Sequence, residues 1–327
     1  MTVSKARITA IGSYVPERVL TNADLEKMVE TSDEWIVQRT GIRERRIAHE
    51  NEFTSDLCVQ AVRNLMERFN KPVDDVDMIM VCTMTPDFHT PSVASLVQGK
   101  LGINNTGAID LNAACGGFTY GLHLANGLVT SGLNKKVLVI GAETLSRITD
   151  FTDRNTCVLF GDGAGVALVE YDEECPSFLA SHLGSVGEAG MHLYCTNLSN
   201  RMDELLLKDH GFIVQNGREV YKWAVTTVPQ GMTKVMEKAG MDLSDVNWFV
   251  PHSANLRMIE SMCEKSGFPI EQTLYSLEKY GNTSSASIPL ALDKGIKEGK
   301  LQRGDNILLY GFGGGLAYCG LLVQWTI

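Results

Sequence analysis

Uninterrupted apolar segments alternate along this chain with segments that carry apolar residues at helical spacing. The segments 77–82, 136–141 and 306–311 predict strands with both faces buried, as in the middle of a parallel sheet. Residues 7–12 predict a further strand near the start. Between these strands, one helical stripe combines six apolar residues: Leu57, Ala61, Val62, Leu65, Met66 and Phe69. The pattern therefore predicts an α/β fold in which helices cover sheets.

Landmarks of the first half recur in the second half at a constant offset of 170 residues. Four pairs share this offset: Asp75 and Asp245, Cys82 and His252, Asn112 and Asn282, and Gly141 and Gly311. A constant spacing across separated landmarks is typical of a duplicated unit. The polar segment 171–176 suits a junction between the copies. We therefore predict two related parts, residues 1–172 and residues 173–327.

The size and charge of the chain narrow its function class. Its 327 residues, of which 44% are hydrophobic, can bury one large core or two mid-sized ones. The net charge of −10 argues against a surface that binds nucleic acid. No apolar signal region follows the first residues, and no apolar run approaches the length of a membrane span. We therefore expect a soluble, cytoplasmic protein that binds neither nucleic acid nor membrane.

The cysteines predict neither a metal site nor a disulfide framework. There are eight, with no C-x-x-C pair and none at metal-binding spacing from a histidine. In a reducing compartment they are expected to be free thiols, and most of them suit small buried positions. The eight are Cys58, Cys82, Cys115, Cys157, Cys175, Cys195, Cys263 and Cys319.

Cys115 stands at a turn between a predicted strand, 108–111, and a predicted helix, 120–128. A thiol near a helix N-terminus is favoured as a thiolate by the helix dipole and by free backbone N–H groups. The small neighbours Gly116 and Gly117 would let a substrate approach closely. The position also suits a buried structural cysteine at a tight turn, and the local sequence leaves both interpretations open.

Two polar residues of the second half could join Cys115. His252 follows a predicted strand, at the sheet edge where α/β proteins bind ligands, and Asn282 occupies the turn that matches the Cys115 turn in the repeat. Taken alone, such a histidine is usually structural and such an asparagine usually caps a turn. If the halves pack about a pseudo-twofold axis, however, the two turns face each other. One site would then combine a thiol nucleophile with two polar groups.

Two glycine clusters, 161–165 and 313–315, lie before or between predicted strands. Neither cluster opens a helix or precedes Lys-Ser or Lys-Thr, which argues against dinucleotide-binding and phosphate-binding loops. The first cluster suits close backbone packing, whereas the second could offer a backbone N–H group to an oxyanion.

Motifs spread over nearly the whole chain resemble those of the β-ketoacyl-acyl carrier protein synthase III family, and they occur in the family's order. They are Thr31-Ser32-Asp33-Glu34-Trp35-Ile36, Arg39-Thr40-Gly41-Ile42-Arg43-Glu44-Arg45, the Cys115 turn, Phe160-Gly161-Asp162-Gly163-Ala164-Gly165, Pro251-His252, Gly281-Asn282-Thr283 and Gly311-Phe312-Gly313-Gly314-Gly315. The resemblance implies the thiolase fold, a five-layer αβαβα sandwich of two thiolase-like βαβ halves, and usually a homodimer. It also implies an acyltransferase that joins a short acyl-CoA primer to malonyl-acyl carrier protein at the start of fatty acid synthesis.

The resemblance further implies roles for particular residues. Cys115, His252 and Asn282 would form a Cys-His-Asn triad in which Cys115 takes the acyl group from CoA. His252 and Asn282 would stabilise the enolate that forms when malonyl-acyl carrier protein loses CO2. The backbone N–H groups of Cys115 and Gly314 would hold the tetrahedral oxyanion. No metal or cofactor is expected, because hydrogen bonds would stabilise the negative charge of the enolate.

The same resemblance implies a CoA site. Trp35 and Arg154 would enclose the adenine, Thr31 and Arg39 would serve the base and phosphates, and Asn255 would contact the pantetheine arm. Without the resemblance, the residues from 31 to 39 suit an ordinary surface helix.

Docking and primer residues are implied in the same way. Arg257, with Lys222 and Lys265 as possible neighbours, would guide the acidic carrier protein. Thr90 stands where family members restricted to short straight primers often carry phenylalanine, in a segment expected at the dimer interface near the partner's acyl pocket. A smaller side chain there predicts that branched primers are accepted as well as straight ones.

Three positions depart from the family pattern. Ser253 replaces a frequent glutamine, which leaves the triad untouched, Arg218 replaces an asparagine that contacts pantetheine in some members, and Glu264 replaces a basic residue. Two alternatives to the proposed family role remain. One is another thiolase-fold condensing enzyme, such as a chalcone-synthase-like or secondary-metabolite ketosynthase, although these are usually longer or lack the block around Trp35 and Arg39. The other is a catalytically silent member, against which the intact triad argues.

Overall fold

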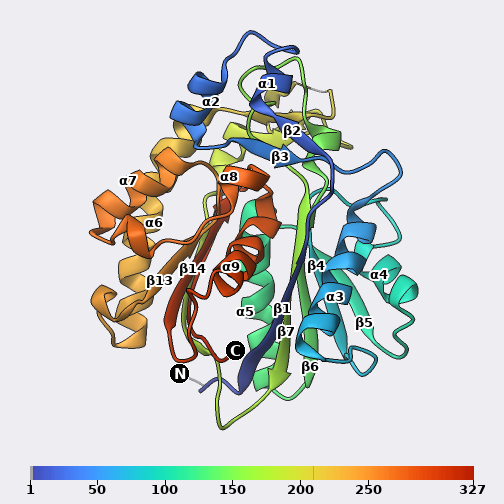
Figure 1. Cartoon of the computed structure of the whole chain (residues 1–327), viewed down its shortest axis with the longest axis vertical. Coiled ribbons are helices and arrows are strands. Elements are labelled where there is room, and N and C mark those ends of the chain that lie inside the picture. Colours follow the sequence, from blue (N-terminus) through green and yellow to red (C-terminus); the bar gives the residue numbers. More distant parts are fainter. Residues whose placement is uncertain (1–2, 209) are drawn as a thin grey trace.

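Two sheets form the framework of the computed structural model, which describes residues 3–208 and 210–327 (Figure 1). The first sheet contains five strands, in the order β1 (Ala6–Tyr14), β7 (Gly163–Tyr171), β6 (Lys136–Glu143), β4 (Met78–Cys82) and β5 (Gly107–Leu111). The second contains four strands, in the order β13 (Trp248–Pro251), β14 (Asn306–Gly313), β15 (Ala317–Gln324) and β8 (Phe178–Ser185). Each sheet therefore draws all of its strands from one side of the polar segment 171–176.

Helices cover the outer face of each sheet and fill the space between the sheets. On the outside, α3 (Thr54–Phe69) and α4 (Val93–Leu101) pack against the first sheet, and α6 (Gly217–Ala239) and α7 (Leu256–Ser266) pack against the second. Between the sheets lie α5 (Gly117–Thr130) and α9 (Ser287–Lys297). This order of helix, sheet, helix, sheet and helix is the predicted five-layer sandwich.

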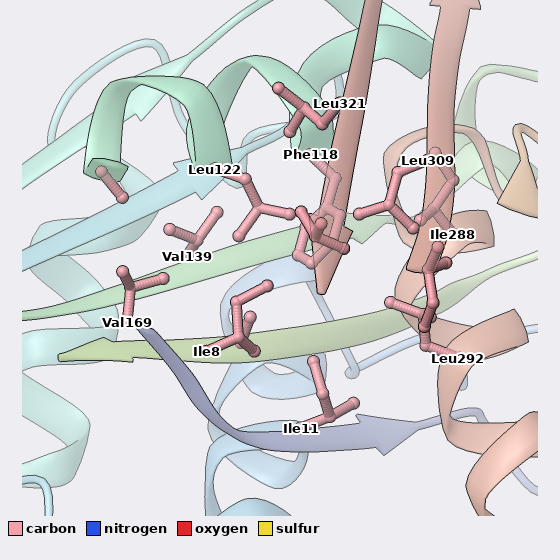
Figure 2. Close-up of a cluster of buried hydrophobic side chains, with 14 of the residues drawn as sticks. Ile8, Ile11, Phe118, Leu122, Val139, Val169, Ile288, Leu292, Leu309 and Leu321 are labelled. Atoms are coloured by element: carbon pink, nitrogen blue, oxygen red, sulfur yellow. The ribbon is translucent and has the colours of Figure 1, made fainter. Parts of the chain in front are cut away.

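The core between the sheets combines apolar side chains from both halves of the chain (Figure 2). Phe118 and Leu122 of α5 meet Ile288 and Leu292 of α9, with strands of both sheets on either side. Each such side chain is almost fully buried, and burying one contributes about 1.5–3 kcal/mol to folding. The shared core holds the two sheets in a fixed relation, which in turn fixes the site between them.

The uninterrupted apolar segments form central strands, as predicted. Nearly every residue of β4, β6 and β14 is buried, because each strand has a neighbour on both sides and helices on both faces. β4 pairs in parallel with β5 and β6, and β13 pairs in parallel with β14. The carboxyl ends of these parallel strands carry Cys82, Glu143, His252 and Gly313, so they bring residues of both halves toward one region.

The offset of 170 residues recurs in the positions of backbone elements. β6 and β14 are both eight residues long and begin at 136 and 306, that is, 306 − 136 = 170. The 3-10 turns η1 (Ala114–Gly116) and η6 (Ser284–Ala286) show the same offset. Ala114 and Ser284 have positive φ angles of 43° and 49°, which L residues rarely adopt. Asn112 Oδ1 accepts from the Ala114 N–H at 3.2 Å, and Asn282 Oδ1 accepts from the Ser284 N–H at 2.9 Å.

Shorter elements surround the upper end of the sandwich in Figure 1 and close the space above the strands. They are β2 (Val19–Thr21), α1 (Asn22–Leu25), α2 (Asp33–Thr40), β3 (Glu44–Arg46), η2 (Leu145–Ile148), η3 (Gly187–His192), β9 (Leu193–Cys195), β10 (Arg201–Met202), β11 (Leu205–Leu206), β12 (Ile213–Gln215) and α8 (Leu277–Tyr280). Two further 3-10 turns, η4 (Leu243–Asp245) and η5 (Ile270–Gln272), flank β13 and α7. Among the residues that the structure describes, no helix is both long and apolar enough to cross a bilayer.

Candidate active site

Cys115 lies in η1, immediately before α5, where this turn approaches β14. A Cβ atom at Gly313 would come within 2.9 Å of the Cys115 sulfur, so the close approach requires glycine. Burial raises the pKa of the Cys115 thiol to about 11, while the Ser284 hydroxyl and the backbone N–H groups of Cys115 and Gly314 oppose this rise. The two predicted oxyanion donors therefore lie close to the sulfur.

His252 follows β13 and is almost completely buried. Its Nδ1 atom lies 2.7 Å from the Ser287 hydroxyl, which also accepts from the Ser253 N–H at 3.2 Å, and its ring stands edge-on to Phe312. Burial lowers the pKa of His252 to about 3, so the imidazole is neutral at ordinary pH. Because Nδ1 faces Ser287, Nε2 is the ring nitrogen left for a ligand.

The side chain of Asn282 has a fixed orientation. Its Oδ1 atom accepts from the Ser284 N–H at 2.9 Å, and a backbone N–H can only donate. The amide nitrogen therefore points away from this contact and can donate to a ligand. Asn282 thus holds the η6 turn through Oδ1 and leaves its amide nitrogen available.

These three side chains line one cavity of about 1000 Å³ together with Gly314 and Thr90. The cavity lies between the two halves, because Cys115 and Thr90 come from the first and His252, Asn282 and Gly314 from the second. The structure thus brings together the residues predicted for the triad, the oxyanion hole and the primer pocket. What each of them does chemically stays a prediction.

A second cavity of about 810 Å³ adjoins the first and contains Trp35, Arg39 and Asn255 in its wall. Six residues line both cavities: Leu159, Tyr194, Ile213, Gln215, Asn255 and Met258. The guanidinium carbon of Arg154 lies 4.4 Å from the centroid of the Trp35 ring, and that of Arg39 lies 5.7 Å away. Two cations therefore lie near the half-buried indole of Trp35.

Two other residues predicted for CoA binding have distinct environments. Asn255 caps α7, because its Oδ1 atom accepts from the Met258 N–H at 2.9 Å, and its amide nitrogen is left for a ligand. Thr31 lies outside the walls of both cavities, and its buried hydroxyl has no hydrogen-bond partner among the described residues.

The predicted docking residues lie on the surface, outside both cavity walls. Arg257 and Lys265 are exposed on α7, about 12 Å apart along the helix axis, and no described carboxylate lies within ion-pair distance of either. Lys222 is exposed on α6 and forms an ion pair with Glu219 at 2.8 Å. Arg218, at the start of α6, is exposed and lines neither cavity.

Sequence reasoning missed three residues around the triad: Glu143, Ser284 and Ser287. Glu143 ends β6 and is completely buried, Ser284 lines the cavity beside Cys115, and Ser287 contacts His252. A charged residue at the carboxyl end of a buried strand was a usable signal for Glu143, because the same argument selected His252.

Metal ligation and disulfide formation are two further kinds of chemistry open to these residue types. Within residues 3–208 and 210–327, no group of three or more His, Cys, Asp or Glu side chains is placed to hold a metal ion. All eight cysteines are free thiols, and Cys195 lies with Cys115 in the wall of the larger cavity.

Comparison with known proteins identifies relatives over the whole chain. The family model 3-Oxoacyl-[acyl-carrier-protein (ACP)] synthase III matches residues 109–187, and the model of its C-terminal part matches residues 236–325. A β-ketoacyl-[acyl-carrier-protein] synthase III 2 of Halalkalibacterium halodurans is 70% identical over 327 residues, which are 100% of this chain and 98% of that protein. The protein of the same name from Bacillus subtilis is 62% identical and covers 99% of each chain.

Solved structures agree with the sequence relatives. The β-ketoacyl-[acyl carrier protein] synthase III of Thermus thermophilus has a TM-score of 0.94 and 45% identity, over 98% of this chain and 99% of that one. The priming β-ketosynthase of the R1128 polyketide biosynthetic pathway has a TM-score of 0.91, but its identity is 34%, over 100% and 98% of the two chains. This polyketide-pathway enzyme thus shares the fold, whereas the relatives at 70% and 62% identity are named for synthase III.

Proposed function

The chain belongs to the β-ketoacyl-[acyl-carrier-protein] synthase III family, and on this premise we propose that Cys115, His252 and Asn282 join an acyl-CoA primer to malonyl-acyl carrier protein. The enzyme is a condensing acyltransferase of fatty acid synthesis. One observation carries the residue assignment: a buried thiol, a neutral imidazole and an available amide nitrogen converge on one cavity.

In the first half-reaction, Cys115 Sγ attacks the thioester carbon of acyl-CoA. The new sulfur–carbon bond forms, the bond to the CoA sulfur breaks, and the thiol proton of Cys115 ends on the departing CoA sulfur. The backbone N–H groups of Cys115 and Gly314 stabilise the oxygen that becomes negative. Their position beside the sulfur supports this role, because they already oppose the rise of the thiol pKa.

In the second half-reaction, malonyl-acyl carrier protein occupies the position that CoA has left. His252 Nε2–H and the Asn282 amide donate to its thioester oxygen while the carbon–carbon bond to the carboxylate breaks and CO2 leaves. The electrons of that bond form an enolate, which attacks the acyl carbon on Cys115. The sulfur leaves and takes up a proton, and 3-ketoacyl-acyl carrier protein is released. A neutral imidazole is supported by the low pKa that burial imposes on His252.

The second cavity is the proposed route for CoA. An adenine placed between Trp35 and Arg154 would have Arg39 beside its phosphates, and Asn255 would contact the pantetheine arm as it passes from one cavity to the other. The six shared wall residues support a continuous path to Cys115. The acidic carrier protein would approach over Arg257, two residues after Asn255, since this arginine is exposed and unpaired among the described residues.

We also propose that the functional unit is a homodimer joined along β5. This strand is one of the two edge strands of the first sheet, and its Ile109 is 46% exposed. The neighbouring segment 86–91 exposes Phe88 to 58%. An unprotected edge with exposed apolar side chains favours pairing with a second copy of the chain. Thr90 lines the cavity of its own chain, and its contribution to the partner's pocket stays a prediction.

Two steps of labelling test the proposed function. Incubation with radiolabelled acyl-CoA should place one acyl group on Cys115, and addition of malonyl-acyl carrier protein should release it as 3-ketoacyl-acyl carrier protein. Peptide mapping must separate Cys115 from Cys195, because both thiols line the cavity. Cys195→Ala should keep the label and Cys115→Ala should lose it. A chain that stays unlabelled would be a silent family member.

A further inference from the structure

Glu143 is a carboxyl group that the reaction described above does not use. It ends β6, and no part of its side chain reaches solvent. The carboxyl accepts hydrogen bonds from the Thr83 hydroxyl at 3.1 Å, the Met84 N–H at 3.1 Å, the Thr85 hydroxyl at 2.7 Å and the Ser285 hydroxyl at 3.1 Å. No described cation forms an ion pair with it. Burial without a countercharge raises the pKa of Glu143 to about 7, against these hydrogen bonds.

The Ser284 hydroxyl lies near both Glu143 and the nucleophile. Ser284 lines the larger cavity with Cys115, and only 1% of its surface is exposed. Its hydroxyl favours the ionised forms of both neighbours, since it lowers the pKa of the Cys115 thiol and of the Glu143 carboxyl. Its Oγ atom nevertheless has no hydrogen-bond partner among the described residues. A buried hydroxyl close to a thiol and a carboxyl, and bound firmly to neither, can pass a proton between them by rotating.

Acylation of Cys115 requires a proton acceptor that the triad does not provide. Burial raises the pKa of the thiol to about 11 and lowers that of His252 to about 3, so an ion pair between these two side chains is strongly disfavoured. Glu143 differs from both, because its pKa lies near neutrality. A group with such a pKa can both accept and return a proton at the working pH.

We propose that Ser284 and Glu143 form a proton relay that serves the acylation of Cys115. The inference rests on the proposed function, in which Cys115 attacks acyl-CoA. As the sulfur–carbon bond forms, the thiol proton passes to the Ser284 oxygen, and the Ser284 proton passes to the Glu143 carboxylate. When the CoA sulfur leaves with the electron pair of its bond, the same two transfers run backward and protonate it. The relay therefore ends in its starting state, with no net charge left in the interior.

A purely structural role for Glu143 is the alternative. Its partners Thr83, Met84 and Thr85 belong to the first half and Ser285 belongs to the second, so the carboxyl also connects the halves. Ser285 additionally donates to the Cys82 carbonyl at 2.7 Å. A structural tie and a relay predict different consequences when the carboxyl is replaced by an amide of the same shape.

Three variants separate the two roles. Glu143→Gln keeps an acceptor oxygen but cannot take up a proton at neutral pH. Ser284→Ala removes the relay hydroxyl, and the backbone should accept alanine because Ala114 holds the equivalent φ of 43° in the other half. Ser285→Ala removes one contact of Glu143 and leaves both relay groups in place, which makes it the matched control.

The measurement is the single-turnover rate of Cys115 acylation by acyl-CoA as a function of pH, with thermal unfolding of each variant alongside. In the wild type the rate should rise through about pH 7, because the relay needs ionised Glu143. The other titratable groups that sense the charge of Glu143 are the thiols Cys58, Cys82 and Cys115, whose pKa values are all raised, so they do not titrate in this range. The Glu143→Gln variant should lose this rising limb of the pH–rate profile, and its Cys115 should be acylated about 100-fold more slowly.

The hydroxyl variants should behave in opposite ways. Ser284→Ala should slow acylation as Glu143→Gln does, whereas Ser285→Ala should keep the limb near pH 7 and the wild-type rate. Release of CO2 by enzyme that has already been acylated should be unchanged in all three. If Cys115 of the Glu143→Gln variant is acylated at the wild-type rate and with the wild-type pH profile, the relay is overturned. A wild-type chain that takes no acyl group would instead overturn the proposed function.

Discussion

The Arg154 guanidinium lies over the indole of Trp35, with 4.4 Å between the guanidinium carbon and the ring centroid. Ser32 caps α2 by accepting from the Trp35 N–H at 3.1 Å, which fixes the backbone that carries the indole. The side chain of Arg154, in contrast, is exposed. A purine that stacks on this face of Trp35 would take the place of the guanidinium. Arg154 would then move outward and cover the other face of the purine.

Removing either side of this stack should weaken acyl-CoA binding while leaving the chemistry intact. Stacking on an aromatic side chain contributes about 1–3 kcal/mol per base, so Trp35→Ala and Arg154→Ala should each raise the KM for acyl-CoA about 5- to 150-fold at nearly constant kcat. Trp35→Phe is the matched control and should retain most of the affinity. A short acyl thioester without a nucleotide should be used equally well by all of these proteins. If a variant loses as much activity with the short thioester as with acyl-CoA, Trp35 and Arg154 do not belong to the CoA site.

His252 and Asn282 should serve the second half-reaction more than the first. Both side chains donate toward an oxygen that becomes negative only when malonyl-acyl carrier protein loses CO2. Removing one donor of this kind costs about 100- to 1000-fold in rate. His252→Ala and Asn282→Ala should therefore still take an acyl group from acyl-CoA but fail to release CO2. The two rates are measured separately, by single-turnover acylation and by release of labelled CO2. A comparable loss in both would contradict the division.

The rate of the second half-reaction should not show the pH dependence that an ordinary histidine would cause near pH 6.5. The pKa of His252 is lowered to about 3 by burial, so the imidazole stays neutral as the pH falls from about 8 to about 5. CO2 release by pre-acylated enzyme should therefore be flat over that range. The stability of the fold should decrease as the pH falls below about 6.5, because the unfolded imidazole then binds a proton that the folded one refuses. A limb of the CO2-release profile near pH 6.5 would show that His252 titrates normally.

The long-range pattern of the chain was predictable from sequence because it depends on repetition. Fully buried strands require continuous apolar segments, and a duplicated half requires a constant offset, so both left regular signals at β4, β6 and β14. The same offset located the turn of Asn282 opposite the turn of Cys115. The family motifs then pointed to Trp35 and Arg39, which no local pattern had distinguished from a surface helix.

The polar interior was not predictable, because its stability depends on partners far away in the chain. Arg45 is completely buried, and its guanidinium donates to the Leu20 carbonyl, the Asn22 side chain and the Val158 carbonyl. Glu143 is buried among donors from residues 83–85 and from Ser285. An isolated charge in a sequence is normally a surface residue, and only the assembled fold supplies the hydrogen bonds that let it be buried.

Charge reversal at Arg257 should weaken use of the carrier protein and spare acyl-CoA. The net charge of the chain is −10, so docking another acidic protein depends on local cations. Arg257→Glu should raise the KM for malonyl-acyl carrier protein, most strongly at low salt, and leave acylation by acyl-CoA unchanged. Arg303→Glu makes the same charge change in an exposed turn before β14, at the opposite end of that strand from Gly313. An unchanged dependence on carrier-protein concentration would remove Arg257 from the docking surface.

The primer pocket should accept branched acyl groups as well as acetyl. Thr90 lines the cavity of Cys115 in a segment that Asp87 anchors, since this carboxylate accepts from the Ser55 N–H at 2.9 Å and from the Ser55 hydroxyl at 2.6 Å. A threonine leaves space that an aromatic ring would fill, so the wild type should use isobutyryl-CoA and isovaleryl-CoA as well as acetyl-CoA. One methylene group in such a pocket changes discrimination by about 1–3 kcal/mol, or about 10- to 200-fold.

Direct competition among the three primers measures this preference. Thr90→Phe should depress both branched primers far more than acetyl-CoA, because the ring would occupy the end of the pocket while the volume next to Cys115 stays open. Thr90→Val keeps the size of the side chain, replaces only its hydroxyl and should keep the wild-type preference. If the wild type clearly prefers acetyl-CoA to both branched primers, another wall residue sets the pocket size, and Thr90→Phe should then have little effect.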